Sequence, residues 1–403
     1  MPPGVRVGEG QPRDTTPRTP AGPEEEHRMD LSRTREIFER PGPFATVYLE
    51  AVQAGENSAK QVELRWRDLQ KQLQQRGADD KTIAALDEEL GDDRAGSLTE
   101  VGRVLVASAD GVLFDDEVEA VGAAGDVAIW SPLPELGRYY RSQSSSVRTL
   151  LAIVDQTGGD LYELVAAYET GARELDEQHI SGSAVENVHK AREGGNAHKQ
   201  RQRRHEKATY QNAEEVVAGL RSAASSFRPQ VLALAGEVQG RQAVRSKLPT
   251  ELAEITEELD AGSRAAGASE TALEDELLRV AGTVATGEEG RVREQLLEGK
   301  AHANAVEGLE PVLEAARTGA VDTLVLVDGQ EIPGELYVGS SPEQISTDPK
   351  NLAQLSDTEP VARPSEQVLL RAVGALGGSV SVLGGGTSLQ DGVGALLRFP
   401  TGS

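Results

Sequence analysis

The first third of the chain contains two patterns of apolar residues: short continuous runs, and residues spaced as on one face of a helix. Apolar residues at Val62, Trp66, Leu69 and Leu73 recur at helical intervals after Ser58, which can cap a helix. Asp110-Gly111 separates two apolar runs, a spacing typical of a β-hairpin. These signals predict a mixed α/β domain. Its expected strands are 44–49, 104–107, 112–114 and 126–130.

The middle third repeats this mixture around one long helix. Apolar runs at 147–154 and 161–168 predict two strands of a hairpin joined around Gly158-Gly159, and 231–235 reads as a buried strand. From Gly195 to about Ala224 the pattern is helical, roughly 28 residues or ~42 Å long. Its first half has no apolar stripe, whereas the second half does. We therefore expect the second half to pack on the domain and the first half to project.

The last third alternates helices with short strands, which indicates an α/β sandwich. Val306, Leu309, Leu313 and Ala316 predict one helix that stops at Gly319, and a second helix is expected over 365–376. The predicted strands are 321–327, 380–383 and 395–399.

The fold class is therefore α/β with three α/β domains. Residues 1–28 contain six Pro and four Gly with almost no large apolar residue, so we predict a disordered tail. The predicted domains are an N-terminal α/β domain at 29–143, a middle domain at 144–267 and a C-terminal domain at 268–403.

Composition restricts the possible functions. The chain of 403 residues has no cysteine, which excludes disulfides, thiol nucleophiles and thiolate zinc sites and suits a reducing cytoplasm. No apolar run approaches the ~20 residues of a membrane span, and no secretory leader is visible, so we expect a cytoplasmic protein without membrane contact. The net charge of −25 argues against general nucleic-acid binding.

One basic segment opposes this charge. Residues 190–207 contain seven Lys or Arg and two Glu, with Gly194-Gly195 inside the segment. Such a local reversal predicts contact with a polyanion at this place, mainly through phosphates. Gly194 and Gly195 permit close backbone approach, and Asn196 carries an amide that can read a base edge or a ribose hydroxyl. The predicted RNA-binding residues are Lys190, Arg192, Gly194, Gly195, Asn196, His198, Lys199, Arg201, Arg203, Arg204 and Lys207.

Other constellations are weaker. His198 and His205 lie two helical turns apart, too far for one metal ion, so we predict no metal site and no cofactor. Asp155 and Asp160 flank the hairpin and could hold Mg²⁺ in a nuclease, although aspartate is also what turns require. The glycines at 384–386 lack the Gly-Lys-Ser/Thr ending of a phosphate loop. No catalytic residue is assigned.

Together these residues resemble the archaeo-eukaryotic peptide chain release factors. In those factors a Gly-Gly-Gln loop leads into a basic helix, as Gly194-Gly195-Asn196 does here, and the segments 319–327 and 391–399 look like parts of their C-terminal domain. The resemblance is to the bacterial branch, which contains the ribosome hibernation factor Balon and actinobacterial relatives and is related to Pelota. It implies an RNase-H-like middle domain and a ribosomal-protein-like α/β/α C-terminal domain.

The resemblance also implies a function. It predicts a ribosome-binding hibernation or stress factor that occupies the A site, contacts large-subunit rRNA and has elongation factor Tu as a candidate partner. Asn196 is one methylene shorter than the family's glutamine, which misplaces its amide by about 1 Å, and we expect no peptide release. The alternatives are a peptidyl-tRNA hydrolase that rescues ribosomes, a nuclease using Asp155 and Asp160, and a stress-related binding module unconnected to the ribosome.

Overall fold

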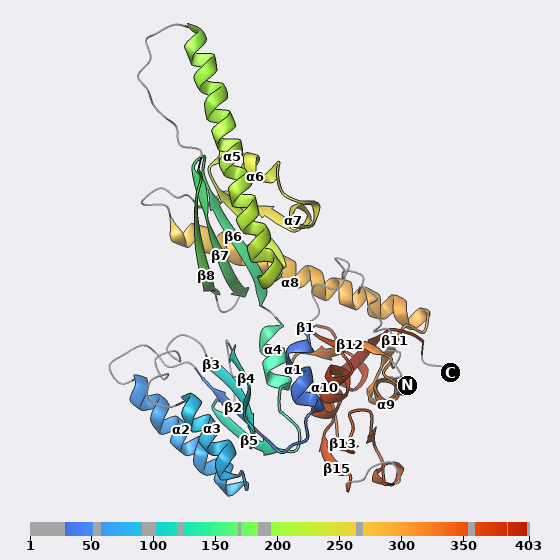
Figure 1. The fold of residues 1–403 in the computed structure, drawn as a ribbon. Helices are drawn as coiled ribbons and strands as arrows, with labels where there is room; N and C mark the ends of the chain where they lie inside the picture. The colour runs from blue at the N-terminus through green and yellow to red at the C-terminus, as the bar shows by residue number, and fades with distance from the viewer. Residues whose placement is uncertain are drawn as a thin grey trace, which may run out of the picture.

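The computed structural model describes ten segments of the chain, and the helices and strands form four sheets with their covering helices (Figure 1). The predicted tail at 1–28 lies outside the described residues. The described segments are 29–50, 58–90, 102–118, 125–144, 146–167, 171–183, 195–262, 269–353, 359–384 and 386–400.

The first block contains an antiparallel sheet in the order β4-β3-β2-β5. The helices on one of its faces bury Val62, Trp66, Leu69 and Leu73, the stripe predicted from the sequence. Its elements are β2 (Phe44–Leu49), α2 (Ser58–Gln75), α3 (Asp80–Leu90), β3 (Gly102–Ser108), β4 (Gly111–Val118), β5 (Val127–Ser131) and α4 (Gly137–Gln143).

The middle block is a five-stranded sheet in the order β10-β9-β6-β7-β8. Strands β6, β7 and β8 form an antiparallel meander, while β9 runs parallel to β6 and β10 runs parallel to β9, which is the RNase-H-like arrangement. Its elements are β6 (Val147–Val154), β7 (Gly158–Ala167), β8 (Gly171–Ser181), α5 (Gly195–Phe227), β9 (Val231–Gly236), α6 (Val238–Arg245), α7 (Thr250–Glu254) and β10 (Thr256–Glu258).

The last block has a five-stranded sheet in the order β1-β16-β12-β17-β11 and a small sheet, β14-β13-β15. Helices α9 and α10 cover one face of the larger sheet, and the end of α8 covers the other, so this block is an α/β/α sandwich. Its elements are α8 (Glu270–Ala301), β11 (Ala305–Glu307), α9 (Leu309–Arg317), β12 (Val321–Val327), β13 (Glu335–Val338), β14 (Ile345–Ser346), η2 (Pro349–Asn351), β15 (Val361–Pro364), α10 (Ser365–Ala375), β16 (Ser379–Leu383), η3 (Gln390–Gly392) and β17 (Val393–Leu397).

Two sequence predictions need correction here. Val306 does not open a helix: it lies in β11, which pairs with β17, and Gly308 at φ +92° separates this strand from α9. Gly158 and Gly159 do not form the hairpin turn either. They are the first residues of β7, and the turn is made by residues 155–157.

The first and last blocks share one hydrophobic core, although they are far apart in the sequence. Strand β1 (Met29–Asp30) pairs with β16, and α1 (Ser32–Glu39) brings Phe38 against Gly374 of α10. The second face of the β2 sheet, including Phe44 and Tyr48, belongs to the same cluster as the buried side chains of α9 and α10. Strand β2 is therefore buried on both faces, which explains why all six of its residues are buried and all but Thr46 are apolar or aromatic.

Polar contacts cross the same interface. The Arg141 guanidinium pairs with Glu366 at 2.8 Å and donates to the carbonyl oxygens of Val327 (2.6 Å) and Gln330 (3.1 Å). Only 19% of either charged side chain is exposed. Gly137 lies beside this pair, and a Cβ at that position would displace the Glu366 carboxylate from its present place.

Helix α8 links the middle block to the rest of the molecule. Leu277, Val280 and Ala281 from its first part join the core of the middle sheet, whereas Val292 and Leu296 join the core of the C-terminal sheet. No fully buried residue occurs between them, although Val284 and Ala285 pack against the middle core. Gly287 and Gly290 lie in this stretch, and a Cβ at either position would meet open space. The helix is therefore shared by two cores, with its least supported turns in between.

We expect Gly287→Ala and Gly290→Ala each to raise the free energy of unfolding by about 0.5–1 kcal/mol, because alanine restricts the unfolded chain and meets nothing in the folded helix. Denaturant unfolding measures the change. Gly299→Ala in the same helix is the control: its Cβ would lie 2.7 Å from the Ala305 Cβ, so it should destabilise. Equal effects at all three positions would contradict the packing described.

Glu135 gives the interface a dependence on pH. Burial raises the pKa of this carboxyl group to about 7; Arg138 lowers it and Glu366 raises it further. The folded protein therefore binds a proton that the unfolded chain, with a glutamate pKa of about 4.3, has already lost near neutrality. This contribution to stability is fully present below the unfolded pKa and is lost as pH rises through the folded value.

We therefore expect the free energy of unfolding to fall between about pH 5 and pH 8, and Glu135→Gln to flatten that slope. Urea unfolding at a series of pH values measures it. Glu63→Gln, at an exposed ion pair on α2, should leave the slope unchanged. An unaltered slope in Glu135→Gln would show that another group is responsible.

Candidate nucleic-acid interface

The candidate site lies on α5, a helix of 33 residues that is about 50 Å long at 1.5 Å per residue. Figure 1 shows that its N-terminal part extends well beyond the end of the middle sheet, while its C-terminal part lies along that sheet. The predicted helix is therefore confirmed, with its start at Gly195, and so is the projection of its first half.

The C-terminal half packs because it carries an apolar stripe. Ala213, Val216, Val217 and Leu220 are buried in one cluster with side chains of β6, β7, β9 and α6. Gly219 lies in the same contact, where a Cβ would overlap the Ile180 side chain. This half therefore holds the direction of the whole helix.

Asn212 fixes the helix where packing begins. Its side chain is buried, and its Nδ2 donates to the Gln156 carbonyl oxygen in the β6–β7 turn at 2.9 Å. One turn further along the helix, the Glu215 carboxylate accepts hydrogen bonds from the Ser183 backbone N–H at 3.0 Å and from its hydroxyl. Helix α5 is thus attached to the end of β8 as well as to the sheet.

Gly182 completes this anchor. Its backbone N–H donates to the Thr157 carbonyl oxygen at 2.8 Å, and a Cβ on Gly182 would overlap the Asn212 amide. The turn, the end of β8 and α5 therefore meet at one tightly packed point. Ser183 is the last described residue before the basic segment.

The predicted RNA-binding residues fall in three groups. Lys190, Arg192 and Gly194 lie outside the described residues. Gly195 begins α5, and Asn196, His198, Lys199, Arg201, Arg203 and Arg204 follow within its first three turns; the backbone is helical there, and their side chains are outside the described part. Lys207 is exposed on the helix. The structure thus places the predicted residues from Gly195 to Lys207 on one helix. That any of the residues in the three groups binds RNA remains a prediction.

The two aspartates considered for a nuclease have other partners. The Asp155 carboxylate accepts hydrogen bonds from the Thr157 and Gly158 N–H groups at 2.6 and 3.0 Å, so it shapes the turn as predicted. Asp160 contacts the His179 ring across the β7–β8 pair. Within the described ranges, no group of three or more His, Asp or Glu side chains is arranged to hold a metal ion.

The strands below the helix are acidic. Burial raises the pKa of Tyr162 to about 12, with Glu177 and Asp160 contributing, and burial together with Asp176 raises the pKa of Glu163. Strands β7 and β8 carry five acidic residues against one arginine, so this part of the sheet is negatively charged. The cations of α5 are concentrated in its projecting half, up to Lys207, and only Arg221 lies in the packed half.

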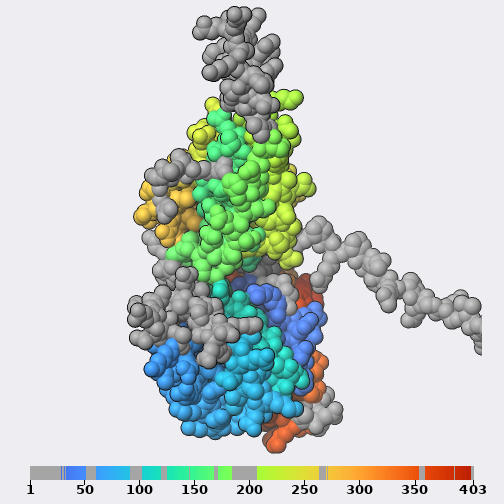
Figure 2. All heavy atoms as spheres, turned by 60° about the vertical axis from the view of Figure 1, so that its left-hand side comes forward, coloured from blue at the N-terminus to red at the C-terminus, as the bar shows by residue number. Residues whose placement is uncertain are grey.

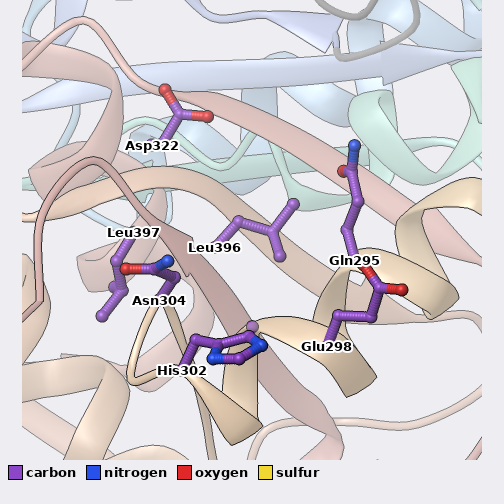
Figure 3. A pocket seen from close by; sticks show the side chains of 8 residues that line it. Gln295, Glu298, His302, Asn304, Asp322, Leu396 and Leu397 are labelled. Carbon is purple, nitrogen blue, oxygen red and sulfur yellow. The ribbon is translucent and has the colours of Figure 1, made fainter.

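A pocket lies far from α5, at the end of α8 (Figure 3). It is an open pocket of about 270 Å³ in which Gln295 and Glu298 of the helix face His302, Asn304 and Asp322. The carboxylate of Asp322 also lies 3.8 Å from Arg398. None of the lining residues is a serine, threonine, lysine or tyrosine, so the pocket contains no side-chain nucleophile of those types.

Sequence reasoning missed the anchor and the strand that leads into it. Strand β8 is mostly charged and polar, with Leu175 and Ile180 as its only large apolar residues, and so it lacks the apolar alternation of a strand. The available hint was Asn212, a polar residue one position before the apolar stripe of Ala213, Val216 and Val217. Its role depends on Gly182, which is 30 positions away in the chain.

The fold and the site together define an RNase-H-like α/β domain with a projecting basic helix. Residues 148–302, which include α5 in full, match the model of the bacterial archaeo-eukaryotic release factor family 2. The resemblance to the bacterial branch of this superfamily is thereby confirmed over that segment. A closer kinship with the hibernation factor Balon remains a prediction.

Similar proteins extend over more of the chain. Uncharacterized protein Rv2629 of Mycobacterium tuberculosis (strain ATCC 25618 / H37Rv) is 28% identical over 377 residues, which are 92% of this chain and 97% of that protein. The protein MT2704 of strain CDC 1551 / Oshkosh gives the same values.

Solved structures give weaker likenesses. Pelota of Archaeoglobus fulgidus matches with a TM-score of 0.28 and 19% identity over 74% of this chain and 80% of that one. Dom34 of Saccharomyces cerevisiae, a translation termination-like factor, matches with a TM-score of 0.38 and 13% identity over 72% and 74%. These TM-scores are too low to establish a common arrangement of whole chains, so the family match rests on the sequence of 148–302.

The anchor can be tested by a double-mutant cycle. Gly182→Ala should destabilise the protein by about 1–3 kcal/mol, because its Cβ overlaps the Asn212 amide. In the Asn212→Ala background the same change should cost less, since the two closest atoms, Cγ and Oδ1, are gone and only the contact with the Cβ at 2.6 Å remains. Denaturant unfolding of the four proteins gives the coupling energy, expected above about 1 kcal/mol. Additive effects would refute the contact.

Proposed function

We propose that this protein is a ribosome-binding translation factor of the hibernation or stress type, which inserts the N-terminal part of α5 into the rRNA of the large subunit at the A site. The observation that carries the proposal is the projection of a basic helix from an acidic protein. The match of 148–302 to a release-factor family supports the ribosome, rather than another polyanion, as the partner.

The charge distribution suits such a role. Cationic side chains near RNA phosphates release counterions, which provides affinity without sequence readout. The remaining surface of this chain has a large negative charge and is repelled by RNA, so binding should be confined to the helix. A ribosome ligand of this kind works in the cytoplasm, and elongation factor Tu is proposed as a second partner. Among the described helices, none has the length and apolar character needed to cross a membrane.

The loop chemistry favours occupancy over catalysis. Asn196 stands where the release factors carry glutamine, and a shorter side chain leaves its amide about 1 Å short of the ester that it would have to orient water against. We therefore propose a binding protein rather than an enzyme. A peptidyl-tRNA hydrolase that rescues ribosomes is the second candidate, favoured by the preserved Gly194-Gly195 pair.

Ribosome binding gives the first test. Wild-type protein should co-sediment with vacant 70S ribosomes at low salt and release as salt rises, and the Lys199/Arg201/Arg203/Arg204→Ala variant should fail to bind. If those four side chains contact phosphates, any residual binding should show a slope of log K against log salt that is shallower by about three.

A matched control removes the same charge elsewhere. Arg35, Arg67, Lys71 and Arg317 each form an exposed ion pair on a helix away from α5, and their joint replacement by alanine should leave binding close to wild type. If wild-type protein does not sediment with ribosomes at any salt concentration, the proposal is wrong. If both quadruple variants bind equally, the helix is not the contact.

Peptide release distinguishes the two candidates. Ribosomes carrying a labelled peptidyl-tRNA are incubated with wild type, Asn196→Ala and Asn196→Gln proteins. We expect no release by wild type and at most a small loss of binding in the two variants, because the phosphate contacts of the Lys and Arg side chains remain. Release by wild type that is lost in Asn196→Ala would replace the binding function with the hydrolase.

A further inference from the structure

Tyr210 is an exposed aromatic side chain on α5, just beyond the basic segment. Its side chain is 48% exposed, in a chain in which aromatic residues make up only 3%. The other tyrosines that the structure describes are at least partly covered: Tyr48, Tyr139 and Tyr140 are buried, and Tyr162 and Tyr337 are half-buried. No packing requirement of the fold therefore explains an aromatic ring at position 210.

The surroundings of Tyr210 on the helix are cationic on one side only. Lys207 is exposed and lies one turn earlier, on the same face by helical spacing. By the same spacing, positions 199 and 203 fall on this face further toward the helix start, and Glu206 is the acidic position beside them. One turn after Tyr210, the Glu214 carboxylate pairs with Lys247 at 2.7 Å, where α5 meets the end of α6.

These residues form a cationic strip along α5 that ends at Tyr210. Cationic positions lead up to the exposed ring, and beyond it the helix turns to local ion pairing and to the buried contact of Asn212. A strip that combines cations with an accessible aromatic face is the arrangement that binds a nucleic-acid strand, because the cations follow phosphates and the ring stacks on a base.

We propose that Tyr210 stacks on an unpaired nucleobase of the RNA and marks the inner limit of the contact surface on α5. The inference rests on the proposed function, because it needs RNA along the helix. It adds a contact that is not electrostatic, at a residue outside the basic segment. Stacking of one base is worth about 1–3 kcal/mol, or roughly a 5- to 100-fold change in affinity.

The test compares Tyr210→Ala and Tyr210→Phe in ribosome binding at several salt concentrations. Tyr210→Ala should weaken binding about 5- to 100-fold by the same factor at every salt concentration, because stacking releases no counterions. Tyr210→Phe should bind like wild type, since it keeps the ring. Leu297→Ala, which removes a 66% exposed apolar side chain from α8, is the control and should have no effect.

A second measurement separates RNA from a protein contact. Affinity for a short single-stranded RNA is compared with that for the same RNA carrying abasic residues. We expect Tyr210→Ala to weaken binding of the intact RNA only. An equal loss on the abasic RNA, or a Tyr210→Phe protein as defective as Tyr210→Ala, overturns stacking.

The failures are distinguishable. If Tyr210→Ala binds ribosomes like wild type while the Lys199/Arg201/Arg203/Arg204→Ala variant does not, the stacking inference is wrong and the proposed function stands. If wild type does not bind ribosomes, the proposed function fails, whatever the Tyr210 variants do. A loss on ribosomes without a loss on intact single-stranded RNA assigns the ring to a ribosomal protein and also overturns the inference.

Discussion

The burial of one half of α5 is the contact on which the proposed interface depends. Its first half has no apolar stripe, and like charges four residues apart at positions 199, 203 and 207 oppose helix formation. A short isolated helix of that kind is only marginally stable in water, because nucleation is costly. Here the packed turns around Val216 and Leu220 supply the nucleus, and the cationic turns extend it.

The contact between Gly182 and Asn212 also holds α5 in place. The projecting half of α5 keeps one direction only if the packed half cannot tilt. Apolar contacts alone would allow the helix to slide along the sheet. A buried amide that donates to the Gln156 carbonyl, packed against a residue without a side chain, allows a single register. The hydrogen bonds of Ser183 to Glu215 attach the chain after β8 to the same part of α5.

The N-terminal and C-terminal blocks form one unit, and the middle block with α5 is attached to it. The N-terminal sheet does not stand alone, because β1 and α1 belong to the C-terminal sandwich and Phe44 and Tyr48 share its core. Figure 1 and the space-filling view in Figure 2 agree that the middle block rises from this combined body. Helix α8 joins the two parts, and between Ala285 and Val292 it contributes no side chain to either core.

The sequence by itself determined the local features of this protein. Spacing of apolar residues predicted α2, α5, α10 and most strands, since helix and strand periods depend on short-range geometry. The charge reversal at 190–207 likewise identified the candidate site without a structure. Strand β8 escaped because its residues are charged and exposed, so that pairing with β7 rather than an apolar period makes it a strand.

Only the tertiary structure decided which distant segments meet. The partnership of Gly182 with Asn212, the pairing of β1 with β16 and the contact of Arg141 with Glu366 join positions 30, 225 or more than 300 residues apart. No local pattern encodes such contacts, because each depends on the shape that the whole chain has already taken. Exposure belongs to the same class: the sequence contains seven tyrosines, and folding alone left Tyr210 on the surface beside Lys207.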